Sequence, residues 1–152
     1  MAEIGFYHLT RTALPEALAK LLDRTLKAGQ RALVLCPDEG RIKALDKALW
    51  DLPADGTEAV WLPHGTAADG DADLQPVWLS ATADAVNGAR YLFLVDGVEC
   101  SATDAFDRVF DLFDGTDETA TEAARARWRV AKAGGHALTY WKQGARGWEK
   151  GA

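Results

Sequence analysis

The sequence predicts an α/β fold in which a largely parallel sheet lies between helices on both faces, as a three-layer sandwich. Short apolar runs alternate with segments whose leucines recur every three or four residues, and this alternation is typical of βα units. Continuous runs such as ALVLC at 32–36 and YLFLV at 91–95 are typical of strands covered on both faces. With 152 residues and a hydrophobic fraction of 48%, the chain can form one domain with its own core.

The elements of the first half are bounded by helix start and stop residues. Pro15 fits the first turn of a helix, and Gly29 follows its end. Pro37 and Asp38 open a second helix, which Pro53 ends. The expected elements are a strand at 3–9, a helix at 14–28, a strand at 32–36, a helix at 39–50 and a short strand at 60–62, followed by an acidic loop at 66–73.

The second half is expected to contain strands at 77–79, 91–95 and 106–113, a helix to about 133, and a last strand at 137–142. Segment 106–113 is compatible with the end of a helix, but its valine and phenylalanines favour a strand. Thr116 or Asp117 caps the following helix, and the pair Gly134-Gly135 ends it. We therefore expect one domain over residues 1–142 and a frayed, flexible tail over residues 143–152.

Composition and motifs argue against several classes of function. The pI of about 5.0 disfavours duplex DNA as the main ligand, because affinity for duplex comes from neutralising phosphates. No apolar run approaches the roughly 20 residues of a membrane span, and the N-terminus does not resemble a signal peptide, so a cytoplasmic location is expected. Phosphate-binding loops, dinucleotide fingerprints and hydrolase elbows are missing from the sequence. We expect a protein without catalytic activity, cofactor or metal.

Four local features have a structural explanation that is better than a functional one. Cys36 ends an expected strand and could be a nucleophile beside a helix N-terminus, but a buried strand cysteine explains it better. His8 is expected to be structural, and His64 to form a hydrogen bond in a loop. The acidic loop lacks the spacing of a calcium loop, so a solvated loop is the better interpretation.

The most informative feature is a reversal of charge near the C-terminus. Residues 1–115 contain ten Lys and Arg against nineteen Asp and Glu, whereas residues 116–152 contain seven against four. The stretch 123–148 has six cations and no acid. A basic area on an acidic protein is where an anionic partner is expected to dock.

Helical spacing places an aromatic ring among these cations. On a helix over 116–133, one face carries Arg125, Trp128, Arg129 and Lys132. With no acid expected nearby, arginine offers a fork for a carboxylate and the indole an apolar wall. The opposite face carries Ala120, Ala123, Arg127 and Val130. It is expected to pack on the sheet, with the Arg127 side chain snorkelling to solvent. A solvated face that complements the helix dipole is the alternative.

A second candidate surface is formed by Trp50, Trp61, Pro63 and His64. Trp50 ends a helix, and Trp61 belongs to a short strand expected at a sheet edge. Ordinary core packing is an equally good explanation of these residues from the sequence.

An ordered series of fragments resembles the chi subunit family of bacterial DNA polymerase III. The fragments span residues 6–142 and are FYHL at 6–9, LDKALW at 45–50, WLPHG at 61–65, FDRVFDLFDG at 106–115, ARARWR at 124–129 and TYWK at 139–142. The resemblance implies a Rossmann-like α/β accessory subunit of the replicative polymerase that has no nucleotide chemistry. It also implies a monomer without membrane contact, which meets nucleic acid only indirectly.

The resemblance further implies two partners. The first is the acidic C-terminal tail of single-stranded DNA-binding protein, which ends in a Phe carboxylate; the tail-binding positions match Arg125, Trp128 and Arg129, with Lys132 nearby. The family often carries a lysine where Thr121 stands here. The second is a psi-like or other clamp-loader subunit, expected at the Trp50 surface. The alternatives are direct binding of single-stranded nucleic acid on Trp128 and Trp148 beside Arg146, and a nucleotide-binding enzyme with a degenerate motif.

Overall fold

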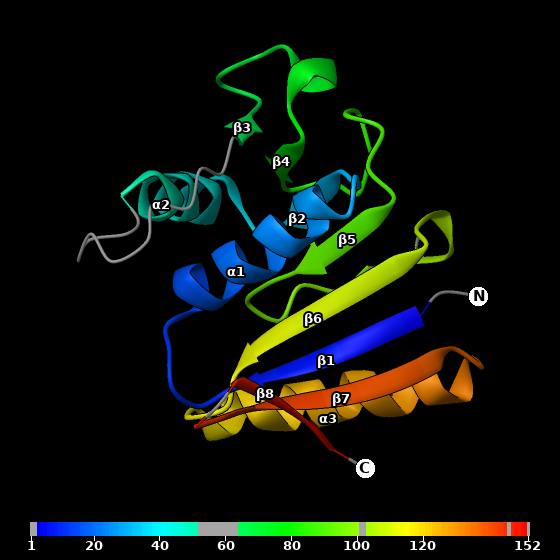
Figure 1. Cartoon of the computed structure of the whole chain (residues 1–152). Helices are drawn as coiled ribbons and strands as arrows, with labels where there is room; N and C mark the ends of the chain where they lie inside the picture. Colours follow the sequence, from blue (N-terminus) through cyan, green and yellow to red (C-terminus); the bar gives the residue numbers. More distant parts are fainter. Residues whose placement is uncertain (1–2, 52–63, 101–102, 146, 152) are drawn as a thin grey trace.

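The computed structural model describes residues 3–51, 64–100, 103–145 and 147–151. Within these ranges, three α-helices pack against one sheet (Figure 1). The helices are α1 Leu14–Lys27, α2 Glu39–Trp50 and α3 Glu118–Ala133. The strands are β1 Glu3–Leu9, β2 Ala32–Leu35, β3 Gly65–Thr66, β4 Val77–Ser80, β5 Tyr91–Leu94, β6 Arg108–Asp114, β7 Ala137–Gly144 and β8 Gly147–Gly151.

The sheet is parallel except at one edge. The strand order is β3-β4-β2-β5-β6-β1-β7-β8. Among the strand pairs of the described residues, β7 and β8 are antiparallel and all the others are parallel. Helices α1 and α2 pack on one face of the sheet, whereas α3 packs over β6 and β7 on the other. The expected α/β class, the largely parallel sheet and the helices on both faces are therefore confirmed. The narrower Rossmann-like description stays a prediction.

The helix ends follow the predicted capping residues. The carboxylate of Asp38 accepts a hydrogen bond from the Arg41 backbone N–H at 2.8 Å and caps α2. Asp117 caps α3 in the same way, accepting from Thr119 N at 2.9 Å. Gly135 has a φ of 80°, the left-handed conformation that commonly ends a helix at glycine.

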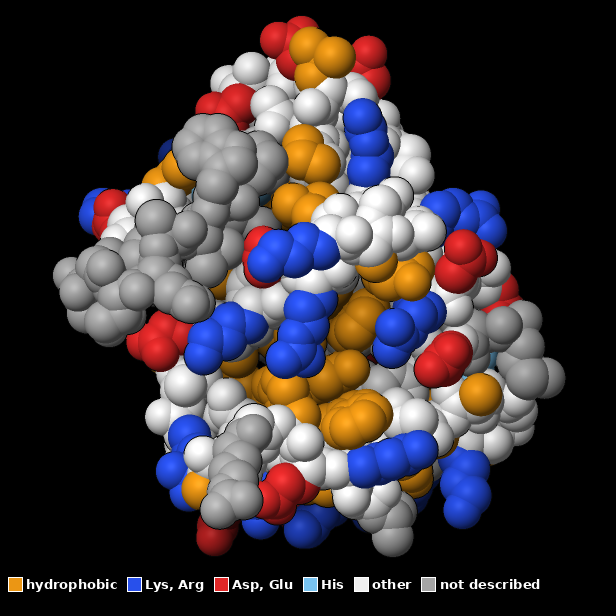
Figure 2. Space-filling model, in the orientation of Figure 1, with side chains coloured by type: hydrophobic (Ala, Val, Ile, Leu, Met, Phe, Trp, Pro, Cys, Tyr) orange, Lys and Arg blue, Asp and Glu red, His pale blue; other side chains and the backbone are white. Residues whose placement is uncertain are grey.

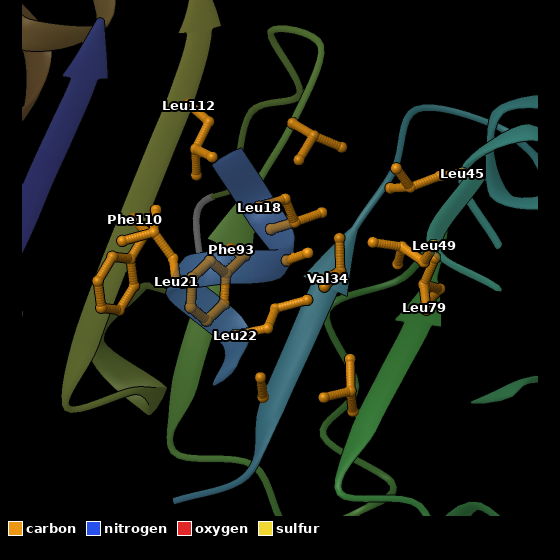
Figure 3. Close-up of a cluster of buried hydrophobic side chains, with 14 of the residues drawn as sticks. Leu18, Leu21, Leu22, Val34, Leu45, Leu49, Leu79, Phe93, Phe110 and Leu112 are labelled. Atoms are coloured by element: carbon orange, nitrogen blue, oxygen red, sulfur yellow. The ribbon is translucent and has the colours of Figure 1, made fainter. Parts of the chain in front are cut away.

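The core on the α1 and α2 side is almost entirely aliphatic and aromatic. Figure 3 shows leucines of both helices pointing toward the buried residues of the central strands. The labelled members of this cluster are Leu18, Leu21, Leu22, Val34, Leu45, Leu49, Leu79, Phe93, Phe110 and Leu112. This packing fixes β5, β6 and β1 as a rigid base for the residues on the opposite face of the sheet.

The C-terminal segment differs from the expected frayed tail. Strand β7 continues to Gly144, and β8 returns antiparallel to it, with Lys142 opposite Glu149. Trp148 anchors this hairpin because its indole packs on the buried ring of Tyr7, with 5.0 Å between ring centroids. The expected strand at 106–113 is confirmed as β6, which begins two residues later and ends at Asp114. The strand expected at 60–62 lies outside the described residues.

The packed face of α3 also differs from the prediction. Ala123 and Val130 are exposed, and Val130 is 74% accessible, although both were expected to face the sheet. Ala124 is buried instead. Trp128 is half-buried, and its indole contacts the ring of Phe6 on β1. The helix is rotated relative to the expectation because the large indole gains more from burial than a valine or alanine on the same helix.

Candidate functional site

A cavity of about 320 Å³ lies between α3 and the sheet. Its sheet side is formed by Phe6, His8, Phe113 and Tyr140. Its helix side is formed by Thr121, Ala124, Arg125, Trp128 and Arg129. We call this space the α3 cavity.

Strand register and helical spacing bring these residues together. Phe6 and His8 are two apart on β1 and therefore share one face of the sheet. β1 lies between β6 and β7, and Phe6 stands beside Tyr140 in the parallel register. On α3, Arg125 and Trp128 are three residues apart, so they project over the same strands.

The apolar wall of the cavity is aromatic. The Trp128 indole meets the Phe6 ring edge to face, with centroids 5.2 Å apart and planes at 65°. Phe6 is buried, so it holds the indole in one orientation while part of the indole remains accessible from the cavity. Such a wall is suited to an aromatic or other flat apolar group.

The floor of the cavity contains a polar pair from two strands. His8 Nδ1 and the Tyr140 hydroxyl form a hydrogen bond. The Phe113 ring packs against the imidazole, with 4.9 Å between the ring centroids. Burial lowers the pKa of His8, helped by the nearby cations Lys142 and Arg125, while a hydrogen bond to the Gly115 backbone opposes the shift. Burial raises the pKa of Tyr140. At neutral pH we therefore infer a neutral imidazole whose Nδ1 accepts a hydrogen bond from the Tyr140 hydroxyl.

The mouth of the cavity is cationic but not free of acid. The Arg125 guanidinium donates to Glu122 Oε1 at 2.8 Å, and both side chains are about two-thirds exposed, at 64% and 67%. The expectation of no acid nearby is wrong, because Glu122 lies one helical turn before Arg125. Arg129 is exposed, and among the described residues no carboxylate lies within ion-pair distance of it.

The sequence prediction and the α3 cavity overlap in part. The cavity is lined by Arg125, Trp128 and Arg129, whereas Lys132 lies one turn further along α3 and is not part of the lining. Sequence reasoning missed the strand residues, and it treated His8 as structural. Because side chains alternate along a strand, the sequence could have predicted that Phe6 and His8 share one face of β1. That β7 lies next to β1 and brings Tyr140 to the same face is not indicated by any local pattern.

A buried ion pair lies on the other flank of α3. Arg127 Nε and Nη2 donate to the two carboxylate oxygens of Asp111 on β6, at 2.7 and 2.9 Å. The Asp111 side chain is 3% exposed and that of Arg127 11%, so the expected snorkelling of Arg127 to solvent is wrong. This bidentate pair fixes the middle of α3 to the sheet, and with it the neighbouring residues of the cavity.

The second candidate surface is described only in part. Trp50 ends α2, is 50% exposed and stacks on the ring of His64, with centroids 4.1 Å apart. His64 is buried, and its Nε2 lies 3.3 Å from the carbonyl oxygen of Asp46, which holds the imidazole under the indole. Trp61 and Pro63 lie outside the described residues.

The possible nucleophile Cys36 is buried directly after β2, an inner strand of the sheet. Burial, with a smaller effect from Asp96, raises the pKa of its thiol to about 12. A thiol with this pKa is protonated at neutral pH, so the geometry favours a structural cysteine. Within the described ranges, no group of three His, Cys, Asp or Glu is placed to hold a metal, and no helix is long and apolar enough to cross a membrane.

Comparison with known proteins decides the family. Residues 1–139 match the model of the family described as DNA polymerase III chi subunit, HolC. The chain belongs to this family. The DNA polymerase III subunit chi of Escherichia coli is 26% identical to it over 130 residues, covering 84% of each chain. Members of the chi family are accessory subunits in DNA replication.

Proposed function

We propose that this chi-family subunit is a non-catalytic adaptor that binds the acidic C-terminal tail of single-stranded DNA-binding protein in the α3 cavity. The observation that carries the proposal is the combination of an aromatic wall, made by Trp128 and Phe6, with the guanidinium of Arg125 at the same cavity. A peptide that ends in phenylalanine presents a phenyl ring and a carboxylate within one residue. The cavity offers a complementary group for each.

The volume of the cavity is sufficient for the terminal side chain. An engineered cavity of about 150 Å³ in another protein holds a benzene molecule, and the α3 cavity measures about 320 Å³. The phenyl ring would lie against the exposed part of the Trp128 indole, with Phe6 and Phe113 behind it. Aromatic contacts of this kind contribute about 0.5–1.5 kcal/mol beyond the burial of area.

The terminal carboxylate would bind at the polar side of the cavity. Arg125 would exchange its hydrogen bond to Glu122 for a charge-assisted pair with the ligand. Arg129 at the mouth, and Lys132 one turn beyond, would attract the acidic residues that precede the phenylalanine. Exposed charges of this kind act mainly on the association rate and are screened by salt.

A binding titration tests the proposal directly. Anisotropy of a labelled acidic peptide ending in Phe is measured against the wild type and Arg125→Ala. A charge-assisted hydrogen bond contributes about 1.5–3 kcal/mol, and because Glu122 competes for the guanidinium we expect the loss at Arg125 to lie near the lower end, about tenfold. Arg90→Ala is the matched control, since Arg90 is an exposed, ion-paired arginine outside the cavity.

The peptide can be changed as well as the protein. Amidation of the terminal carboxylate and deletion of the final Phe should each weaken binding to the wild type. If Arg125→Ala and Lys132→Ala cause equal small losses, and amidation has no effect, diffuse electrostatic attraction rather than a pocket explains the binding. No binding by a folded wild type contradicts the proposal.

The proposed link to the clamp-loader assembly uses the surface around Trp50. An indole that is 50% exposed and rests on a buried imidazole presents an ordered apolar face, as residues that dominate interfaces do. We expect Trp50→Ala to lose a psi-like or other clamp-loader partner in co-purification while tail-peptide binding is retained. Loss of both activities in a folded variant would contradict two separate surfaces.

A further inference from the structure

A second group of aromatic rings lies on the opposite face of the sheet from the α3 cavity. It consists of Tyr91 on β5, Phe110 on β6, Tyr7 on β1, Trp141 on β7 and Trp148 on β8. We call these residues the aromatic row. The proposed function does not use any of them.

The rings form a continuous path across the strands. Centroids are 5.9 Å apart between Tyr91 and Phe110, and 5.6 Å apart between Phe110 and Tyr7. From Tyr7 the path continues to Trp141 at 6.3 Å and to Trp148 at 5.0 Å. Tyr7 and Trp141 are nearly parallel, at 13°, so their faces have the same orientation.

Part of this row is accessible. Tyr7 and Phe110 are buried and form the base, whereas Tyr91, Trp141 and Trp148 are half-buried. Helices α1 and α2 pack against β2, β4 and β6, and the row extends past them toward the β8 edge. Figure 2 shows this face, with hydrophobic side chains gathered over the region of β6, β1 and β7.

Cations surround the row. The Arg108 guanidinium lies 4.9 Å from the Phe110 centroid and 5.7 Å from that of Tyr91. Lys150 Nζ lies 6.0 Å from the Trp141 ring, and the exposed Arg24 on α1 is close enough to act on the titration of Tyr7. Figure 2 shows Lys and Arg side chains on several sides of the hydrophobic area. Glu3 is a nearby carboxylate, and it acts on the pKa of Tyr7 in the opposite direction, raising it where Arg24 and Arg108 lower it.

We propose that the aromatic row and its cations bind single-stranded DNA directly. Bases would stack on the accessible rings of Trp141, Trp148 and Tyr91, while Arg24, Arg108 and Lys150 would neutralise neighbouring phosphates. Stacking on aromatic side chains within a cationic groove is the general means of binding single strands without sequence preference. DNA rather than RNA is the expected occupant because the family belongs to DNA replication.

An acidic peptide fits this face less well. Several flat rings in series match a series of stacked bases better than they match one terminal side chain. The row also differs from the stacking site that the sequence suggested. Trp128 contacts Phe6 on the α3 side, whereas Trp148 contacts Tyr7 on the other side, so these two indoles cannot form one platform.

The proposal is tested by anisotropy with a labelled oligothymidylate of about 15 nucleotides, using the full chain and no partner protein. Binding is measured over a series of salt concentrations. With about three phosphates neutralised and a slope of about −0.7 for each, the logarithm of affinity should fall with the logarithm of salt with a slope near −2. Only weak binding is expected at physiological salt, because the protein as a whole is acidic.

Variants then locate the site. Trp148→Ala should weaken binding about tenfold, and Trp148→Tyr should retain most of the affinity. Lys150→Gln, which leaves the rings in place, should reduce the salt slope by about 0.7. The matched controls are Trp50→Ala and Lys47→Gln, an exposed indole and an exposed lysine outside the row, and neither should change binding. Circular dichroism establishes that each variant is folded.

The outcomes separate this proposal from the proposed function. Arg125→Ala should lose the tail peptide and keep the oligonucleotide. If Trp148→Ala fails to fold, Lys150→Gln and Arg24→Gln still test the site, since both replace exposed side chains. The proposal is overturned by wild-type protein that does not bind the oligonucleotide, by DNA binding that is lost in Arg125→Ala and unaffected by the row variants, or by tighter binding of oligouridylate than of oligothymidylate.

Discussion

Replacing Arg127 with methionine should destabilise the protein far more than replacing any exposed arginine of α3. Methionine fills the same volume but leaves the Asp111 carboxylate, which is 3% exposed, without the two hydrogen bonds that it accepts at 2.7 and 2.9 Å. Removing one partner of a buried pair costs about 3–5 kcal/mol, because an uncompensated charge remains in the interior. A domain of ordinary stability, about 5–15 kcal/mol, should still fold.

The pH dependence of this loss has a definite sign. In the wild type the pKa of Asp111 is raised, because burial outweighs the opposing effect of Arg127. Without Arg127 only burial acts, so the Asp111 pKa should be higher in the folded variant than in the folded wild type, and in both it lies above that of an unfolded aspartate, near 3.9. The destabilisation should therefore be largest at neutral pH and should decrease as the pH falls toward about 4.

Urea denaturation followed by tryptophan fluorescence measures this difference between about pH 4 and pH 8. The double variant Arg127→Met/Asp111→Asn is the control, because it has no carboxylate to titrate and should lack the pH dependence. Arg129→Met, on the same helix but exposed, should change stability by less than about 0.5 kcal/mol. A loss below about 1 kcal/mol for Arg127→Met, or a loss independent of pH, would refute the reasoning.

Three further predictions concern the α3 cavity. Glu122→Gln releases Arg125 from its ion pair, so affinity for the tail peptide should rise about two- to fivefold, and an unchanged or weaker affinity in the anisotropy titration would contradict this. Gly115→Ala places a methyl group against the His8 ring and 2.7 Å from the Leu9 carbonyl oxygen. The free energy of unfolding, measured by thermal denaturation, should therefore fall by about 1–3 kcal/mol. An unchanged stability would show that the His8 ring moves aside without cost. Burial lowers the pKa of His8 in the free protein, and a bound carboxylate should raise that pKa, so peptide affinity should increase as the pH falls from neutral through the His8 pKa of the complex. His8→Leu should abolish that increase, and a pH profile that the substitution leaves unchanged would exclude His8 as its source.

Local signals in the sequence were sufficient for most elements of the fold. Proline and glycine bounded α1, Asp38 and Asp117 capped α2 and α3, and unbroken apolar runs marked β2 and β5. The hairpin at the C-terminus could not be recognised because β8 is polar apart from Trp148, and its pairing depends on a contact with Tyr7 far away in the sequence.

The helix side of the candidate site was predictable, and the strand side was not. Arg125, Trp128 and Arg129 follow from helical spacing alone. His8 and Tyr140 are 132 residues apart and become neighbours because β1 inserts between β6 and β7, an order that no local pattern encodes. The rotation of α3 was also missed, because it is decided by packing of the indole against β1.

Strand β7 supplies consecutive side chains to two surfaces that face away from each other. Tyr140 lines the α3 cavity, while its neighbour Trp141 belongs to the aromatic row on the far side of the sheet. Point substitutions can therefore alter one surface during evolution and leave the other intact. A single inserted or deleted residue in this strand would exchange the two sets of side chains and damage both at once. The length of β7 should accordingly vary less among relatives than the identity of its residues.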